Sequence, residues 1–152
     1  MAEFTPRNPG FAERTRSSFG RQGFMSYLGA ELTALTPGAC EFRLPYRDEL
    51  SQQHRYFHGG VIGTLADNAG RYAAFTLMGK DDSILTVEFK LNIVAPGEGE
   101  FLVARGHVVK AGQTLSVCRS DVFGVAGDVE TLCGTAQMTL MRLADRPDGP
   151  AD

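Results

Sequence analysis

The chain has 152 residues, of which 43% are hydrophobic and 22% charged, proportions that exclude a disordered chain and a collagen-like repeat. Its length suits one domain with one hydrophobic core. Fifteen Lys and Arg against eighteen Asp and Glu give a formal net charge of −3, so no general basic field attracts nucleic acid. Apolar runs are too short for a transmembrane helix and the N-terminus is too polar for a signal peptide. We therefore expect a cytoplasmic protein that binds neither nucleic acid nor membrane.

The two ends of the chain are polar and contain proline. We expect residues 1–23 to be an N-terminal extension with a short helix within 11–22, and residues 144–152 to be a disordered tail. One domain is expected over 24–143. From Tyr27 the pattern becomes strand-like and indicates a hairpin, because ELTAL and CEFRLPY flank a Pro-Gly turn.

The middle and end of the chain predict one long helix and four antiparallel strands. The helix runs from about Gly59 to Met78, and the strands occupy about 86–94, 101–110, 114–123 and 129–143. The order of a hairpin, one helix and four strands is an α+β arrangement with a single helix packed on a curved sheet.

Residues 86–94 alternate with period two. One face of this strand is predicted to hold Val87, Phe89, Leu91 and Ile93, and the other Thr86, Glu88, Lys90 and Asn92. The three cysteines, Cys40, Cys118 and Cys133, are widely spaced and form no CxxC pair, so we expect buried small side chains without a function.

The long helix has two unlike faces at 100° per residue. The apolar face, expected to meet the sheet, holds Val61, Ile62, Leu65, Ala66, Ala69, Tyr72, Ala73 and Leu77. The opposite face holds Gly60, Gly63, Thr64, Asp67, Gly70, Arg71 and Ala74. A glycine within a helix costs about 1 kcal/mol relative to alanine, so these glycines indicate close approach of a ligand or a second backbone. The alternative is a surface Asp67 paired with Arg71 one turn later.

The segment His58-Gly59-Gly60 stands where the chain enters this helix. The first amides of a helix lack internal partners and point along the positive end of its dipole, so they can bind an anion or a developing oxyanion. The alternative is an ordinary glycine-rich helix entry. At a rise of 1.5 Å per residue, Gly59 and Asp67 lie about 12 Å apart, too far to serve one carbonyl. Two antiparallel helices from two chains would bring them together, so we expect a homodimer with two sites at its interface.

At these residues the chain resembles the PaaI-like acyl-CoA thioesterases of the hotdog fold, in which a curved antiparallel sheet wraps one long central helix. The resemblance covers nearly all of residues 11–143. It is carried by QQHRYFHGGVIGTLADNAGRYAAFTLM, ILTVEFKLNIVAP and VARGHVVKAGQTLSVCRSDVF. It implies hydrolysis of acyl-CoA, with an aryl or fatty acyl group, in a homodimer that often pairs into a tetramer.

The resemblance also implies roles for individual residues. Gly59 would supply the backbone oxyanion donor and Asp67, nine residues after His58, the general base or the nucleophile. His58 and Gln52 take helper positions, and Thr86 aligns with a Ser or Thr that holds the lytic water in some members.

The substrate-binding positions implied by the resemblance are Gly60, Asn68, Arg71 and Lys110. Arg71 departs from the family pattern, where Gly, Ser or Thr is frequent at this place. A guanidinium beside Asp67 should lower the pKa of that carboxyl and weaken it as a base, or else point outward to a CoA phosphate.

Two other functions stay open from the sequence: a hydratase or dehydratase of the same fold, and a non-catalytic module that binds acyl-CoA. No cofactor is expected. A metal site from His54, His58 and Asp67 is not expected either, because both histidines precede the helix and lie far from the acid.

Overall fold

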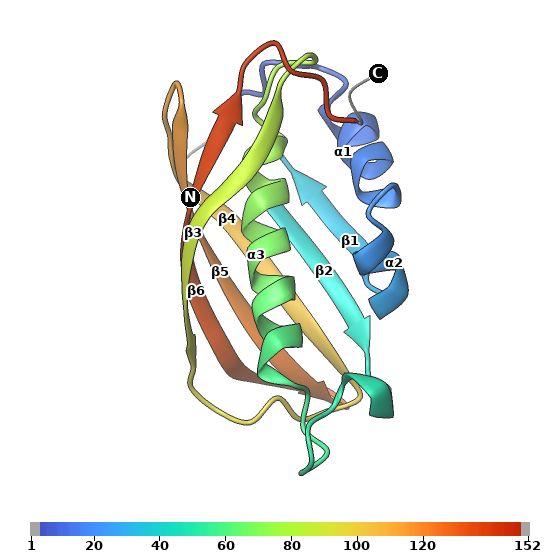
Figure 1. Cartoon of the computed structure of the whole chain (residues 1–152). Helices are drawn as coiled ribbons and strands as arrows, with labels where there is room; N and C mark the ends of the chain where they lie inside the picture. The colour runs from blue at the N-terminus through green and yellow to red at the C-terminus, as the bar shows by residue number, and fades with distance from the viewer. Residues whose placement is uncertain (1–3, 150–152) are drawn as a thin grey trace.

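The computed structural model describes residues 4–149 as one curved antiparallel sheet around a long helix, which confirms the predicted α+β architecture (Figure 1). The strands lie in the order β1-β2-β4-β5-β6-β3. The helices are α1 (Phe11–Gly20), α2 (Gly23–Leu28) and α3 (Gly59–Phe75), with a 3₁₀ turn at Asp48–Leu50. The strands are β1 (Glu31–Thr36), β2 (Ala39–Pro45), β3 (Ser83–Ile93), β4 (Phe101–Ala111), β5 (Leu115–Ala126) and β6 (Val129–Leu143).

Two short helices precede the sheet, and the second corrects the expectation of a strand from Tyr27. Tyr27 lies in α2, and Gly29 ends that helix with a positive φ of 80° while its amide donates to the carbonyl oxygens of Met25 and Ser26. A left-handed glycine after the last helical residue is a common helix stop. The first strand therefore begins only at Glu31.

The helix α3 packs closely onto the middle of the sheet. A Cβ at Gly106 of β4 would stand 2.2 Å from the backbone carbon of Ala69, and one at Gly70 would stand 2.0 Å from Sδ of Met138 on β6. Gly70 therefore makes room for the sheet and not for a ligand, which corrects the predicted face of the helix. The predicted apolar face is buried as expected, with Leu65, Ala66, Ala69, Tyr72 and Ala73 all without solvent exposure.

The end of α3 comes three residues earlier than predicted. Thr76 caps the helix, and its hydroxyl accepts a hydrogen bond from the Gly38 amide (2.8 Å) in the β1–β2 turn. This contact fixes the C-terminal end of α3 against the first hairpin.

A β-bulge in β3 changes the predicted faces of that strand. Its register with β6 shifts between Thr86 and Glu88, so that Thr86 opposes Leu140 and Phe89 opposes Met138, both of which are buried. The extra residue, Val87, therefore puts Thr86 on the helix side together with Phe89, instead of on the opposite face.

The strand β3 also forms one edge of the sheet, since its only partner among the described residues is β6. Large apolar side chains along and just after it are more than two-fifths exposed: Leu85, Val87, Phe89, Ile93 and Val94. A long apolar edge strand is a surface that soluble proteins normally cover.

The remaining predictions about the chain concern its cysteines, its tail and its hydropathy. Cys40, Cys118 and Cys133 are buried and free, as expected. Residues 144–149 run beside α1, whereas residues 150–152 of the expected disordered tail lie outside the described residues. None of the helices within residues 4–149 has the length and hydropathy needed to cross a membrane.

Candidate active site

A groove of about 430 Å³ runs along the exposed side of α3, between that helix, α2 and β3. It brings together four of the residues singled out from the sequence: Gly59, Gly60, Asp67 and Asn68. The other lining residues are Phe24, Gly63, Thr64, Phe89 and Leu91. The groove is therefore polar along the helix and apolar at its flanks.

Asp67 lies half-buried in this groove and is oriented by Thr86. The Thr86 hydroxyl donates a hydrogen bond to Oδ1 of Asp67 (2.8 Å), which only the bulge in β3 makes possible. Among residues 4–149 no donor reaches Oδ2 of Asp67, so that oxygen is free to take a proton or to attack. The structure thus turns one carboxylate oxygen toward β3 and leaves the other for a ligand.

Burial raises the pKa of the Asp67 carboxyl above its ordinary value, although the Thr86 hydrogen bond and the charge of Arg71 each lower it. The pKa is raised overall, so the expectation that Arg71 would lower the pKa of Asp67 is corrected. A raised pKa makes this carboxylate a stronger base than an exposed aspartate.

Arg71 is not paired with Asp67. Its guanidinium is directed to Asp148 of the C-terminal segment, with 3.9 Å between Nη2 and Oδ1, and lies over the ring of Tyr72. The simple surface pair considered from the sequence is therefore absent from the described residues. The contact of Arg71 with a CoA phosphate stays a prediction.

The entry of α3 leaves one backbone amide without an acceptor. Nδ1 of His58 accepts a hydrogen bond from the Gly60 amide (2.9 Å), while the amides of Val61 and Ile62 donate to the His58 carbonyl oxygen. For the Gly59 amide no acceptor is found within the described part of the chain. The positive end of the helix dipole thus presents a single free donor at Gly59.

A second hollow, of about 370 Å³, meets the first at Gly59. It is lined by Gln52, Tyr56, Phe57 and Ile62, and by the end of β3 with the residues that follow it, Ile93–Gly97. Gln52 accepts a hydrogen bond through Oε1 from the His54 amide, which leaves its side-chain amide protons unbound among residues 4–149. Gln52 and Gly59 therefore line the same hollow, and the helper role that the resemblance implies for Gln52 stays a prediction.

Gly59 and Asp67 of one chain lie too far apart to act on the same carbonyl group. Gly59 and Asp67 line the same groove but stand eight residues apart on one helix, a rise of about 12 Å. Lys110 is exposed near the β4–β5 turn and lines neither hollow.

Phe24 is a groove residue that the sequence did not predict. Phe24 on α2 is 61% exposed and stands over the groove opposite Phe89. Phe75 is buried in the core, whereas Phe57, although also buried, lines the second hollow. The available signal was an aromatic residue in a six-residue helix, but so short a helix gives too weak a hydropathy pattern to predict which side chains it exposes.

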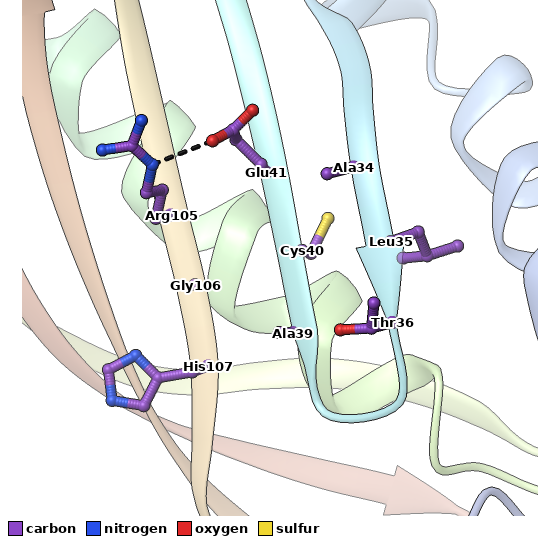
Figure 2. Close-up of a pocket in the computed structure, with 9 residues that line it drawn as sticks. All are labelled: Ala34, Leu35, Thr36, Ala39, Cys40, Glu41, Arg105, Gly106 and His107. Atoms are coloured by element: carbon purple, nitrogen blue, oxygen red, sulfur yellow. Dashed lines mark hydrogen bonds and ion pairs between the residues drawn. The ribbon is translucent and has the colours of Figure 1, made fainter. Parts of the chain in front are cut away.

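A third hollow lies on the other side of the sheet, across β1, β2 and β4 (Figure 2). Its charged members, Glu41 and Arg105, are ion-paired at 2.8 Å, and Arg105 also binds Glu130. His107 lies at its edge and is half-exposed, as expected of a strand residue. With its charges mutually satisfied, this hollow offers no free acid beside a free donor.

Nothing in residues 4–149 forms a metal centre, because no three His, Cys, Asp or Glu side chains converge there. His54 is exposed, and His58 is occupied as the helix cap. The polar side chains that line the groove are Thr64, Asp67 and Asn68, and Thr86 contacts Asp67 from β3.

Replacing Thr86 by Val is expected to raise the pKa of Asp67, because the lost hydrogen bond favours the charged carboxylate. The measurement is a titration of the Asp67 carboxyl carbon by NMR in wild type and Thr86→Val. Thr86→Ser keeps the hydroxyl and should leave the pKa near the wild-type value. Equal shifts in both variants would contradict the role assigned to the hydroxyl.

Comparisons with known proteins show the family and the fold of this chain. The family model described as "Thioesterase superfamily" matches residues 54–131. The crystal structure of a thioesterase family protein from Silicibacter pomeroyi is 42% identical, covers 88% of this chain and 98% of its own, and superposes with a TM-score of 0.87. The 1,4-dihydroxy-2-naphthoyl-CoA hydrolase of Listeria monocytogenes is 23% identical over 62% of this chain and 77% of its own. The E. coli PaaI protein shares the fold, with a TM-score of 0.82 at 15% identity over 93% of this chain and 99% of its own.

Proposed function

Because this chain belongs to the thioesterase superfamily, with the PaaI-like hotdog fold, we propose that it hydrolyses acyl-CoA thioesters to the free acid and CoA. One observation carries the proposal furthest. A half-buried carboxylate with a raised pKa, Asp67, and the Gly59 amide, which has no acceptor among residues 4–149, line one groove. A base or nucleophile together with an oxyanion donor is the minimum that acyl transfer from a thioester requires.

The distance between these groups calls for a second copy of the chain. We place it along β3, where an apolar edge strand would pair with its symmetry mate and bring two α3 helices side by side in opposite directions. Asp67 of each protomer would then face Gly59 of the other. Each dimer would hold two identical sites.

In this arrangement the thioester carbonyl accepts a hydrogen bond from the Gly59 amide, and the helix dipole stabilises the negative charge that develops on its oxygen. Thr86 holds Oδ1 of Asp67, so Oδ2 either deprotonates a water molecule that attacks the carbonyl or attacks the carbonyl itself to form an anhydride that water then hydrolyses. In both routes the C–S bond breaks and CoA leaves as the thiol. Gln52, beside Gly59, orients the carbonyl or the water. His58 acts indirectly, since its bond to Gly60 holds the helix entry in place.

The proposal is tested by release of free thiol from a panel of aryl- and fatty-acyl-CoA esters. We expect turnover of at least one ester by wild type and none above background by Asp67→Asn. Binding of acyl-CoA with equal background rates in both proteins would identify a binding module instead. Addition of water to an enoyl-CoA without release of thiol would identify a hydratase.

A further inference from the structure

The C-terminal segment is attached to both α1 and α3 through one acidic residue. Asp148 is 19% exposed and lies between two arginines. Nη2 of Arg21 is 2.9 Å from its Oδ2 and also donates to its carbonyl oxygen (2.6 Å). Nη2 of Arg71 lies 3.9 Å from its Oδ1. Asp148 is thereby fixed by α1 and presented to the side chain of Arg71.

Arg71 stands one helical turn after Asp67, where an arginine can reach a carboxylate four residues earlier. Its side chain is only 16% exposed, and its Nη2 donates to the Ile84 carbonyl oxygen at 3.4 Å. Its Nη1 is buried without a partner among the described residues. The guanidinium is thus incompletely bound, and its ion pair is with Asp148 and not with Asp67.

The next acid along this side of the molecule cannot replace Asp148. Asp82 is already bound by Arg142, with distances of 2.6 and 3.0 Å. A guanidinium released from Asp148 would therefore find Asp67, whose Oδ2 is free. Pairing there would occupy the oxygen that the proposed reaction uses.

We propose that Asp148 is a positioning residue that holds the Arg71 guanidinium away from Asp67 and so keeps the reactive carboxylate unpaired. The proposal rests on the proposed function for its consequence in catalysis, but its geometry stands on the contacts of Asp148 alone. It assigns a role to Arg71, the residue that departs from the family pattern, and to a segment outside the sheet and the helix.

The charged surroundings of Asp67 are few. Its own helix contributes Arg71, β3 contributes the neutral Thr86, and α2 contributes the neutral Phe24. The C-terminal segment contributes Asp148, which faces Arg71 and is itself bound by Arg21, the residue after α1, and influenced by the charge of Arg14 of α1. A change in the pKa of Asp67 on substitution of Asp148 therefore reports mainly where Arg71 lies.

The test is a double-mutant cycle of Asp148→Asn and Arg71→Met, read by NMR titration of the Asp67 carboxyl carbon and by the pH dependence of kcat/KM. Asp148→Asn should lower the pKa of Asp67 by about one unit or more, because a released Arg71 pairs with it. The acid limb of the profile should move to lower pH, with kcat several-fold lower. In the Arg71→Met background, Asp148→Asn should change neither the pKa of Asp67 nor the pH dependence of kcat/KM.

The cycle separates the proposal from its rivals. If Asp148 acted only through its own charge, the shift in the pKa of Asp67 would persist in the Arg71→Met background, and this result would overturn the proposal. The absence of a shift in both backgrounds would also overturn it. Asp145→Asn is the matched control, since it removes the same charge from the same segment at a residue that contacts neither Arg21 nor Arg71. Because the NMR titration needs no turnover, failure of thioester hydrolysis and failure of this proposal give different results.

Discussion

Asp67→Asn should lower kcat on acyl-CoA by at least about a thousandfold, since an amide can neither accept the proton of a water molecule nor form an anhydride. The Thr86 hydroxyl can still donate to the amide oxygen, so the groove should keep its shape. We expect KM to change little by comparison. The measurement is thiol release under steady-state conditions, with enzyme concentrations high enough to quantify the residual rate.

The same variant should be slightly more stable than wild type at pH 7. Burial disfavours the ionised carboxylate, so the folded-state pKa of Asp67 lies above the unfolded value and wild type is penalised at pH values above both. Asparagine carries no such penalty, so we expect a higher Tm for the variant than for wild type at pH 7. The difference should shrink as pH falls and the wild-type carboxyl becomes protonated. An inactive variant with a strongly reduced Tm would instead indicate a structural role for the acid.

Gly59→Pro is expected to lower kcat by about 10²–10³-fold, because it deletes the amide hydrogen at the helix entry that has no acceptor among residues 4–149. Proline is well accepted at the first position of a helix. His58, with φ −61° and ψ 139°, already has the extended conformation that a residue before proline requires. Circular dichroism should therefore show a folded protein.

Gly59→Ala is the matched control, because it adds a Cβ and keeps the amide hydrogen. That Cβ would stand 2.8 Å from the end of the Ile93 side chain, which is exposed enough to move. Alanine should retain most of the wild-type kcat. Equal losses in the alanine and proline variants would mean that the bulk at residue 59, and not the amide, explains the effect.

Co-expression of the two inactive chains tests whether the site is shared. In a mixed dimer the Asp67→Asn chain supplies Gly59 and the Gly59→Pro chain supplies Asp67, which together make one intact site of two. Random pairing makes about half of the dimers mixed, so about one quarter of wild-type activity should return. A site built within one chain would show no recovery.

The architecture was predictable because helix and strand periodicities are strong and separate cleanly in this chain. Asp67 and Gly59 could be singled out because a carboxylate among glycines and a His-Gly-Gly helix entry are both uncommon in a plain surface helix. Gly70 was assigned to the wrong side, since a single sequence does not distinguish a glycine that admits a ligand from one that admits Met138.

The contact between Thr86 and Asp67 could not be predicted from the periodicity of the strand. Period two places Thr86 on the face opposite Phe89, and the family resemblance implies only that it holds the lytic water. The contact with Asp67 depends on a β-bulge, which leaves no mark in hydropathy. Likewise, the direction of Arg71 depends on Asp148, a residue far along the chain. Helical spacing predicts that Arg71 can reach Asp67 but not that another carboxylate competes for it.

The bulge at Val87 divides β3 into two parts with different structural roles. The part before it carries Thr86, whose hydroxyl is committed to the acid, while the part after it carries Phe89, Leu91 and Ile93 along the two hollows. Substitutions in the second part can change the shape offered to an acyl group without moving the first, whereas inserting or deleting one residue at the junction alters both. Point substitutions in β3 can therefore alter the shape of the hollows while Thr86 keeps its contact with Asp67, whereas a change in the length of the same strand would disturb both.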